Sequence, residues 1–147
     1  MTVNRKNNAR RARLRAADLS VVPEAASYEP PPKHACEPVV TPVPLDDEGL
    51  VQFVYAQQIY RQYVVHFSIE IQCRGHALAD WQTIYRIDTS HGTVHEHVFS
   101  ASGEREIRQV IETIPTEDGW ATVDRWFNRA LDMCDDCWET QVERWKR

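Results

Sequence analysis

The sequence predicts an α+β protein in which an antiparallel sheet of three to four strands carries a long C-terminal helix and a short helix on one face. Three observations predict this class. Residues 63–73 alternate strictly between apolar and polar side chains, which is typical of a half-buried strand. Two further strand-like segments, 81–89 and 93–100, are joined by a short Ser-His-Gly connection. From residue 116 onward, apolar residues recur every three or four positions, as on one face of a helix.

Composition divides the chain of 147 residues into three segments. Residues 1–19 form a basic N-terminal arm, and residues 20–48 hold seven of the eight prolines and are interpreted as an extended linker, partly ordered against the body. Residues 49–147 are predicted to be a single α+β domain, because a chain of this length ordinarily has one core.

The charge is unevenly distributed along the chain. Residues 1–15 contain six basic and no acidic residues, so the remainder has 17 − 6 = 11 basic residues against 22 acidic ones. The arm offers candidate nucleic-acid contacts at Arg10, Arg11, Arg13 and Arg15, although such an arm can equally fold back or lie solvated. The acidic body argues against a broad groove for duplex nucleic acid.

Hydropathy predicts a cytoplasmic protein that does not bind a membrane. The chain has no uncharged apolar run of about 18 residues, and its first residues lack the apolar block of a secretory signal. With no export signal, the four cysteines are expected to be reduced thiols. Cys134 and Cys137 have the spacing of half a zinc site or of a redox pair, but no second such pair follows and no βαβ pattern surrounds them. We therefore interpret them as small apolar residues of the C-terminal helix.

Within the domain, residues 50–60 are rich in strand formers and predict either a fourth strand or an early part of the same ribbon as residues 63–73. Residues 104–114 are predicted to be a short helix ended by Pro115. The long helix that follows carries one apolar stripe, which consists of Val123, Phe127, Leu131, Cys134, Trp138, Val142 and Trp145. Trp126 lies off this stripe and is expected to be exposed at a partner surface.

The segment 86–99 contains three of the six histidines. If His91 and Gly92 are the central residues of a tight turn, then Asp88 pairs with His95 and Arg86 pairs with His97. Because side chains alternate along a strand, Arg86, Asp88, His95 and His97 then lie together on the sheet face away from the helix.

Three chemistries are compatible with that face. In the first, His95 and His97 are the base and acid of a metal-independent ribonuclease, Asp88 orients His95, and Arg86 holds a phosphate. In the second, Asp88, His95 and His97, with or without His91, bind zinc or another divalent metal. In the third, the residues form a satisfied polar network that stabilises the hairpin.

The motif Arg-Ile-Asp-x-x-His-Gly-x-x-His-x-His at residues 86–97 resembles the signature of the TumE-like toxin family and of uncharacterised domains in actinobacteria and their phages. The similarity covers about a third of the chain, from Tyr60 to Gly103. It places Arg86, Asp88, His91, Gly92, His95 and His97 at the motif positions. The resemblance implies a compact α+β domain with a growth-inhibiting, RNA-directed activity.

The expected function is therefore that of a small toxin-like protein of bacterial or phage origin whose histidine face acts on RNA or binds it, without a cofactor. A non-catalytic accessory protein is the alternative. It would bind a protein partner, such as an antitoxin or a phage or host protein, through its arm, linker and exposed tryptophans. The third interpretation is a metal-stabilised binding module.

Overall fold

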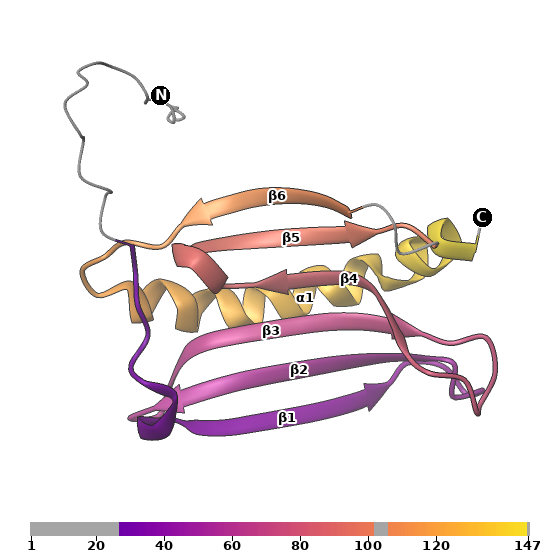
Figure 1. Cartoon of the computed structure of the whole chain (residues 1–147), viewed down its shortest axis with the longest axis horizontal. Coiled ribbons are helices and arrows are strands. Elements are labelled where there is room, and N and C mark those ends of the chain that lie inside the picture. Colours follow the sequence, from indigo (N-terminus) through magenta and orange to yellow (C-terminus); the bar gives the residue numbers. More distant parts are fainter. Residues whose placement is uncertain (1–26, 102–105, 147) are drawn as a thin grey trace, which may run out of the picture.

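The computed structural model describes residues 27–101 and 106–146, and it shows one antiparallel sheet crossed by one long helix (Figure 1). Six strands follow one another in sequence order across the sheet. They are β1 (Glu37–Pro44), β2 (Val51–Tyr60), β3 (Tyr63–Cys73), β4 (Gln82–Asp88), β5 (Thr93–Phe99) and β6 (Glu106–Thr113), and they are followed by α1 (Gly119–Lys146). The α+β class and the long C-terminal helix are confirmed, whereas the predicted number of three to four strands is wrong.

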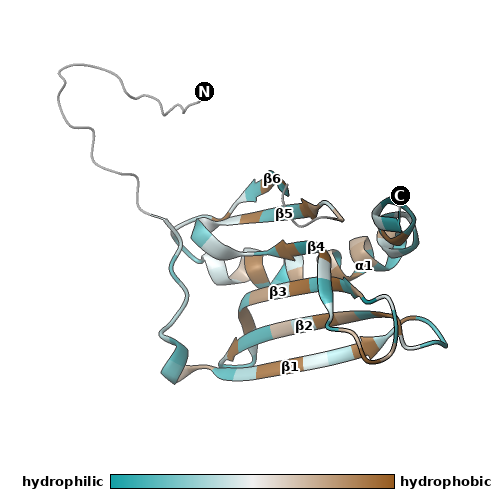
Figure 2. Cartoon of the chain, turned by 45° about the vertical axis from the view of Figure 1, so that its right-hand side comes forward, coloured by the Kyte–Doolittle hydropathy of each residue, from teal (hydrophilic) through white to brown (hydrophobic). Residues whose placement is uncertain are grey.

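Strand β3 lies inside the sheet and supplies much of the core. Its odd-numbered residues Phe67, Ile69 and Ile71 are completely buried. The even-numbered residues between them are only partly covered, so the alternation in the sequence corresponds to the two faces of the sheet. Hydrophobic and hydrophilic residues alternate along the strands in the same way (Figure 2).

Helix α1 covers the face that carries the apolar residues of β3. Phe127 packs edge-on against Phe67, with ring centroids 5.5 Å apart. The helix begins at Gly119, where a Cβ atom would lie 2.4 Å from the ring of Tyr28 and 2.8 Å from Ile114, so only glycine allows this close approach. No helix in the described ranges is long and apolar enough to span a membrane.

The predicted short helix at residues 104–114 is wrong, because residues 106–113 form β6 along the edge of β5. Glu, Arg and Gln are good helix formers, but helix propensity amounts to only a few tenths of a kcal/mol per residue. The edge of β5 offers a ladder of backbone hydrogen bonds, and this tertiary context outweighs local propensity. The added strand widens the sheet beneath α1. Trp126 is therefore buried rather than exposed as predicted, at 4% of its free surface, and its indole N–H donates to Glu112 across 3.0 Å.

Strand β1 lies within the segment that its proline content identified as a linker. Pro38, Pro42 and Pro44 tolerate the strand because β1 is an edge and pairs only with β2. All three prolines are even-numbered, and alternate N–H groups of a strand point to the same side. The positions without an N–H group therefore lie on the side of β1 that does not pair with β2. The sheet therefore begins before residue 49.

Residues 27–32 run past the strand ends from the β5–β6 side of the sheet toward β1 (Figure 1). Tyr28 anchors this segment: its ring is 7% exposed and its hydroxyl donates to the Val65 carbonyl across 2.7 Å. The segment thus closes one end of the layer between the sheet and α1.

Candidate metal centre

The β4–β5 hairpin has the register predicted from the sequence. Asp88 pairs with His95, and Arg86 pairs with His97. The connection is a tight turn, Ser90–Gly92, in which His91 and Gly92 have positive φ angles of 59° and 76°. Glycine adopts this conformation without strain, and histidine tolerates it better than most residues.

The hairpin places its polar side chains on the face of the sheet away from α1. Asp88 pairs with Ser68 and Arg86 pairs with Glu70 on β3, so both belong to the partly covered face of that strand. His95 and His97 follow on β5 with the same orientation. The predicted grouping of the four side chains on the face away from the helix is confirmed.

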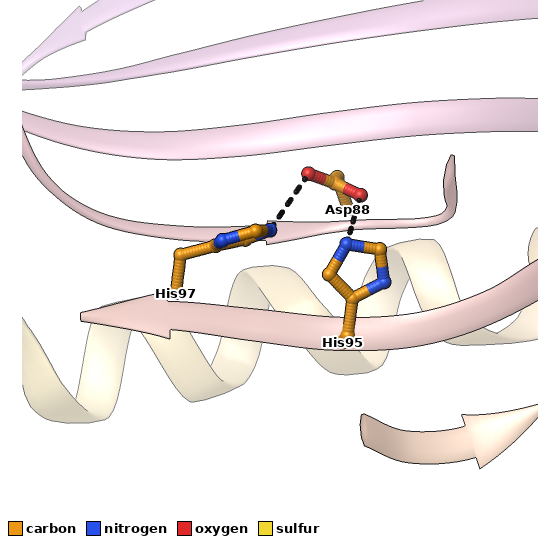
Figure 3. A group of neighbouring side chains, drawn as sticks. All are labelled: Asp88, His95 and His97. Carbon is orange, nitrogen blue, oxygen red and sulfur yellow. Dashed lines mark ion pairs between the residues drawn. The ribbon is translucent and has the colours of Figure 1, made fainter. Parts of the chain in front are cut away.

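Asp88, His95 and His97 converge on a single point, and we call them the histidine–aspartate cluster (Figure 3). The Nε2 atom of His95 lies 2.8 Å from Oδ1 of Asp88, and the Nε2 atom of His97 lies 3.5 Å from Oδ2. One ligand atom from each residue falls within 4.8 Å of the other two. Within residues 27–101 and 106–146 the long helix lies on the other face, yet the members of the cluster are only 1% to 6% exposed. Arg86, Thr93 and Phe99 are among the side chains that contact them.

The outer nitrogen of each imidazole is also engaged. The Nδ1 atom of His95 lies 3.0 Å from the Thr93 hydroxyl and 3.3 Å from the Thr93 carbonyl. The Nδ1 atom of His97 is hydrogen-bonded to the carboxylate of Glu106 on β6. Such contacts on the far nitrogen are what orient histidines that bind a metal through the other nitrogen.

The contact with Glu106 determines where His97 carries its proton. An ionised carboxylate only accepts hydrogen bonds, so Nδ1 is the donor and a neutral ring then has a bare lone pair on Nε2. That lone pair points toward the carboxylate of Asp88. Within the described residues, Nε2 of His97 is the buried side-chain nitrogen that makes no hydrogen bond. A buried polar atom of this kind requires an explanation, and a bound ion is one.

Asp88 is held as a carboxylate. Burial pushes its pKa upward, but the Ser90 N–H, 3.0 Å from Oδ1, and the positive charges nearby outweigh burial and lower the pKa. Among those charges is Arg86, whose Nε lies 3.0 Å from Oδ2. Asp88 therefore offers a negative charge to the point on which the histidines converge.

Both histidines of the cluster are held in the neutral form. Burial lowers the pKa of His95 below its usual value, and the opposing attraction of Asp88 does not restore it. Burial, assisted by Arg86, likewise lowers the pKa of His97. Neutral imidazoles beside an ionised carboxylate are the protonation states that metal ligation needs.

Aromatic contacts fix the plane of the His97 ring. His95 meets it edge-on, with centroids 4.8 Å apart, and Phe99 stacks on it at 6.0 Å with an interplanar angle of 7°. Arg86 lies over the same Phe99 ring, 5.4 Å from its centroid. The ring thus cannot turn without moving several neighbours.

The other predicted site residues are placed differently. His91 sits in the turn and is not one of the three converging residues. The arginines predicted to contact nucleic acid, Arg10, Arg11, Arg13 and Arg15, lie outside the described residues. Sequence reasoning missed Glu106 because it assigned this residue to a helix. The β-branched residues Ile107, Val110 and Ile111 were the available signal for a strand.

The Cys134 and Cys137 pair is separate from the cluster. Both are free thiols on α1; Cys134 is fully buried on the apolar stripe and Cys137 lies at its edge. Burial raises the pKa of Cys137 to about 11 and that of Cys134 further still, so both remain protonated at neutral pH. Metal ligation requires thiolates, so this environment disfavours it.

The fold and cluster together define a small α+β protein with a two-histidine, one-carboxylate group on the face of an antiparallel sheet that lies away from α1. The chain belongs to the family described as "Domain of unknown function (DUF7718)", whose model matches residues 43–147. The matched span includes every residue of the cluster together with Glu106. No curated protein and no solved structure matches the chain.

Proposed function

We propose that this protein binds a divalent transition metal ion, with zinc as the best-matched candidate, through Nε2 of His95, Nε2 of His97 and the carboxylate of Asp88. The main support for this proposal is Nε2 of His97, which faces the carboxylate of Asp88 and makes no hydrogen bond. The bond from Nδ1 to Glu106 leaves the lone pair of the neutral ring on this Nε2 atom. Two acceptors that face each other repel, and a cation between them turns this repulsion into two bonds.

The distances and chemistry support one shared ion. Ligands that share a zinc ion lie roughly 3 to 4 Å apart, because each bond is about 2.0–2.2 Å long. The separation of 3.5 Å between Nε2 of His97 and Oδ2 of Asp88 lies in that range. The separation of 2.8 Å between Nε2 of His95 and Oδ1 of Asp88 is a hydrogen-bond distance, so an ion would have to part these two atoms by a few tenths of an ångström. Three protein ligands leave a further coordination position for water or a substrate, as in catalytic rather than structural zinc sites.

Burial favours this proposal over metal-independent acid–base catalysis by the same histidines. A general acid or base must bring a ring nitrogen within hydrogen-bond reach of the substrate. In His95, which is 1% exposed, one nitrogen faces Asp88 and the other faces Thr93. Ligation of a metal uses the inward-facing nitrogens of both rings and requires no contact between either ring and a substrate.

An RNA-directed, toxin-like activity is a second candidate, and the arginines beside the cluster favour it. Arg86 lies next to Asp88. Arg108, an exposed residue of β6, is the cross-strand neighbour of His97 on β5. Two guanidinium groups beside a metal would suit the negative charge of a phosphodiester. This candidate predicts that the wild type, but not His97→Ala, inhibits the growth of a bacterial host. Equal growth of the two strains at equal expression would end it.

Glu106 provides the test of the proposed metal site, because it acts on the metal only through His97. Glu106→Ala should weaken zinc binding by about 10- to 100-fold in calorimetric titration, the usual effect of removing a partner of a ligating histidine. Glu106→Gln should restore most of the affinity, since its amide oxygen still accepts from Nδ1.

The matched control for these variants is His91→Asn, which changes a histidine of the same hairpin and keeps a residue that tolerates positive φ. Its zinc affinity should equal that of the wild type. A loss in His91→Asn as large as that in Glu106→Ala, or no loss in Glu106→Ala, would contradict the proposed ligand set.

A further inference from the structure

A cavity of about 580 Å³ lies at the end of the sheet where the Tyr28 segment, the β2–β3 turn and the start of α1 meet. Its volume is in the range of small-molecule sites. It involves none of the residues of the histidine–aspartate cluster. Its walls include Tyr28, Tyr60, Arg61, Tyr63, Asp118 and Trp120.

Two of the residues that line this cavity have a strained backbone. Arg61 and Asp118 have φ angles of 52° and 58°, in the left-handed region that favours glycine. Arg61 begins the two-residue turn between β2 and β3, where asparagine followed by glycine is the preferred pair. Strained residues of this kind cluster at functional sites, so the two side chains are candidates for a role beyond the turn itself.

The side chains around the cavity combine three kinds of chemistry. Tyr63 and Trp120 form an aromatic pair with centroids 4.5 Å apart, and they are 45% and 38% exposed, so they present ring surface to a ligand. Arg61 places its guanidinium group 5.1 Å from the centroid of the Tyr60 ring. Asp118 and Glu29 add carboxylates, which accept hydrogen bonds.

We propose that this cavity binds a nucleotide whose base carries an exocyclic amino group. The base would stack on Tyr63 and Trp120, as bases do on exposed aromatic side chains. Its amino group would donate to the carboxylate of Asp118 or Glu29, and the phosphate would pair with Arg61. A purely cationic ligand is the competing occupant, because Asp118 and Glu29 would attract it, but it would leave Arg61 without an anionic partner.

Equilibrium dialysis of the full chain against radiolabelled AMP tests this proposal. EDTA is included so that a metal in the histidine–aspartate cluster does not bind the phosphate. Saturable binding of one AMP per chain is expected, with adenosine, which lacks the phosphate, competing at least about 10-fold less well. Absence of saturable binding, or displacement of AMP by choline at concentrations similar to AMP itself, would overturn the proposal.

The turn supplies a matched pair of variants. Arg61→Asn keeps a residue suited to positive φ but removes the guanidinium group, so AMP binding should fall at least about 10-fold while the melting temperature does not fall. Gln62→Gly relaxes the neighbouring residue, whose φ is 74°, and should leave AMP binding unchanged. Unchanged binding in Arg61→Asn, or an equal loss in both variants, would overturn the role of Arg61.

Discussion

His97→Ala is expected to lower the affinity for zinc by more than about 100-fold, because it removes a ligand and not merely a partner of one. Asp88→Asn should have a similar effect, since it removes the charge that offsets the ion. Without metal, His97→Ala should still fold but melt below the wild type, because it removes a ring that packs on Phe99 and bonds to Glu106. The loss is partly offset, because the same ring carries a buried nitrogen without a hydrogen bond. Calorimetric titration with zinc and thermal melts in EDTA measure the two effects.

His76→Ala is the control for these variants, since His76 is an exposed histidine in the connection between β3 and β4. It should bind zinc as the wild type does. If His97→Ala kept full affinity, or if it unfolded in EDTA, the histidines of the cluster would be structural groups and not ligands.

The second large effect expected is a steep loss of zinc affinity in acid. The pKa values of His95 and His97 lie below the usual 6.5, so both rings are neutral at pH 7 and the affinity should be flat above that pH. As the pH falls through the lowered values, each ring must lose a proton to bind, and the affinity should drop by up to about 100-fold per pH unit. Asp88 adds little, because its pKa lies below 3.8.

The lowered pKa values of His95 and His97 also determine how pH changes the free energy of unfolding of the metal-free chain. Below pH 6.5 the unfolded chain takes up protons on His95 and His97 before the folded chain does. Their contribution to the free energy of unfolding is therefore present above pH 6.5 and is lost as the pH falls toward the folded-state values. A zinc affinity that does not fall at any pH between 7 and the acid unfolding of the chain would contradict ligation by these histidines.

The β4–β5 hairpin could be predicted from the sequence down to the pairing of individual residues. Alternation on either side of His91 and Gly92, with Glu96 as the exception on the apolar face, leaves one register in which most apolar residues face the helix. The grouping of Asp88, His95 and His97 follows from that register alone. Local patterns are sufficient here because the turn residues and the alternation along both strands indicate the same register.

Strands β1 and β6 could not be predicted in the same way, because what stabilises them is the edge of a neighbouring strand. Prolines in β1 argue against a strand unless it is known to be an edge. The sequence of β6 contains helix formers that only the pairing with β5 overrides. The contact between His97 and Glu106, which determines the tautomer of the ring, depends on this strand. It therefore could not be predicted from the sequence.

The X-ray absorption spectrum of the zinc-loaded full chain at the zinc K-edge identifies the ligands of the bound ion. We predict one zinc ion per chain with nitrogen and oxygen ligands at about 2.0–2.2 Å and the multiple-scattering pattern of two imidazoles. Sulfur scattering at about 2.3 Å would place the ion at the Cys134 and Cys137 pair instead. That result, or a chain that holds no zinc after dialysis, would contradict a metal centre at Asp88, His95 and His97.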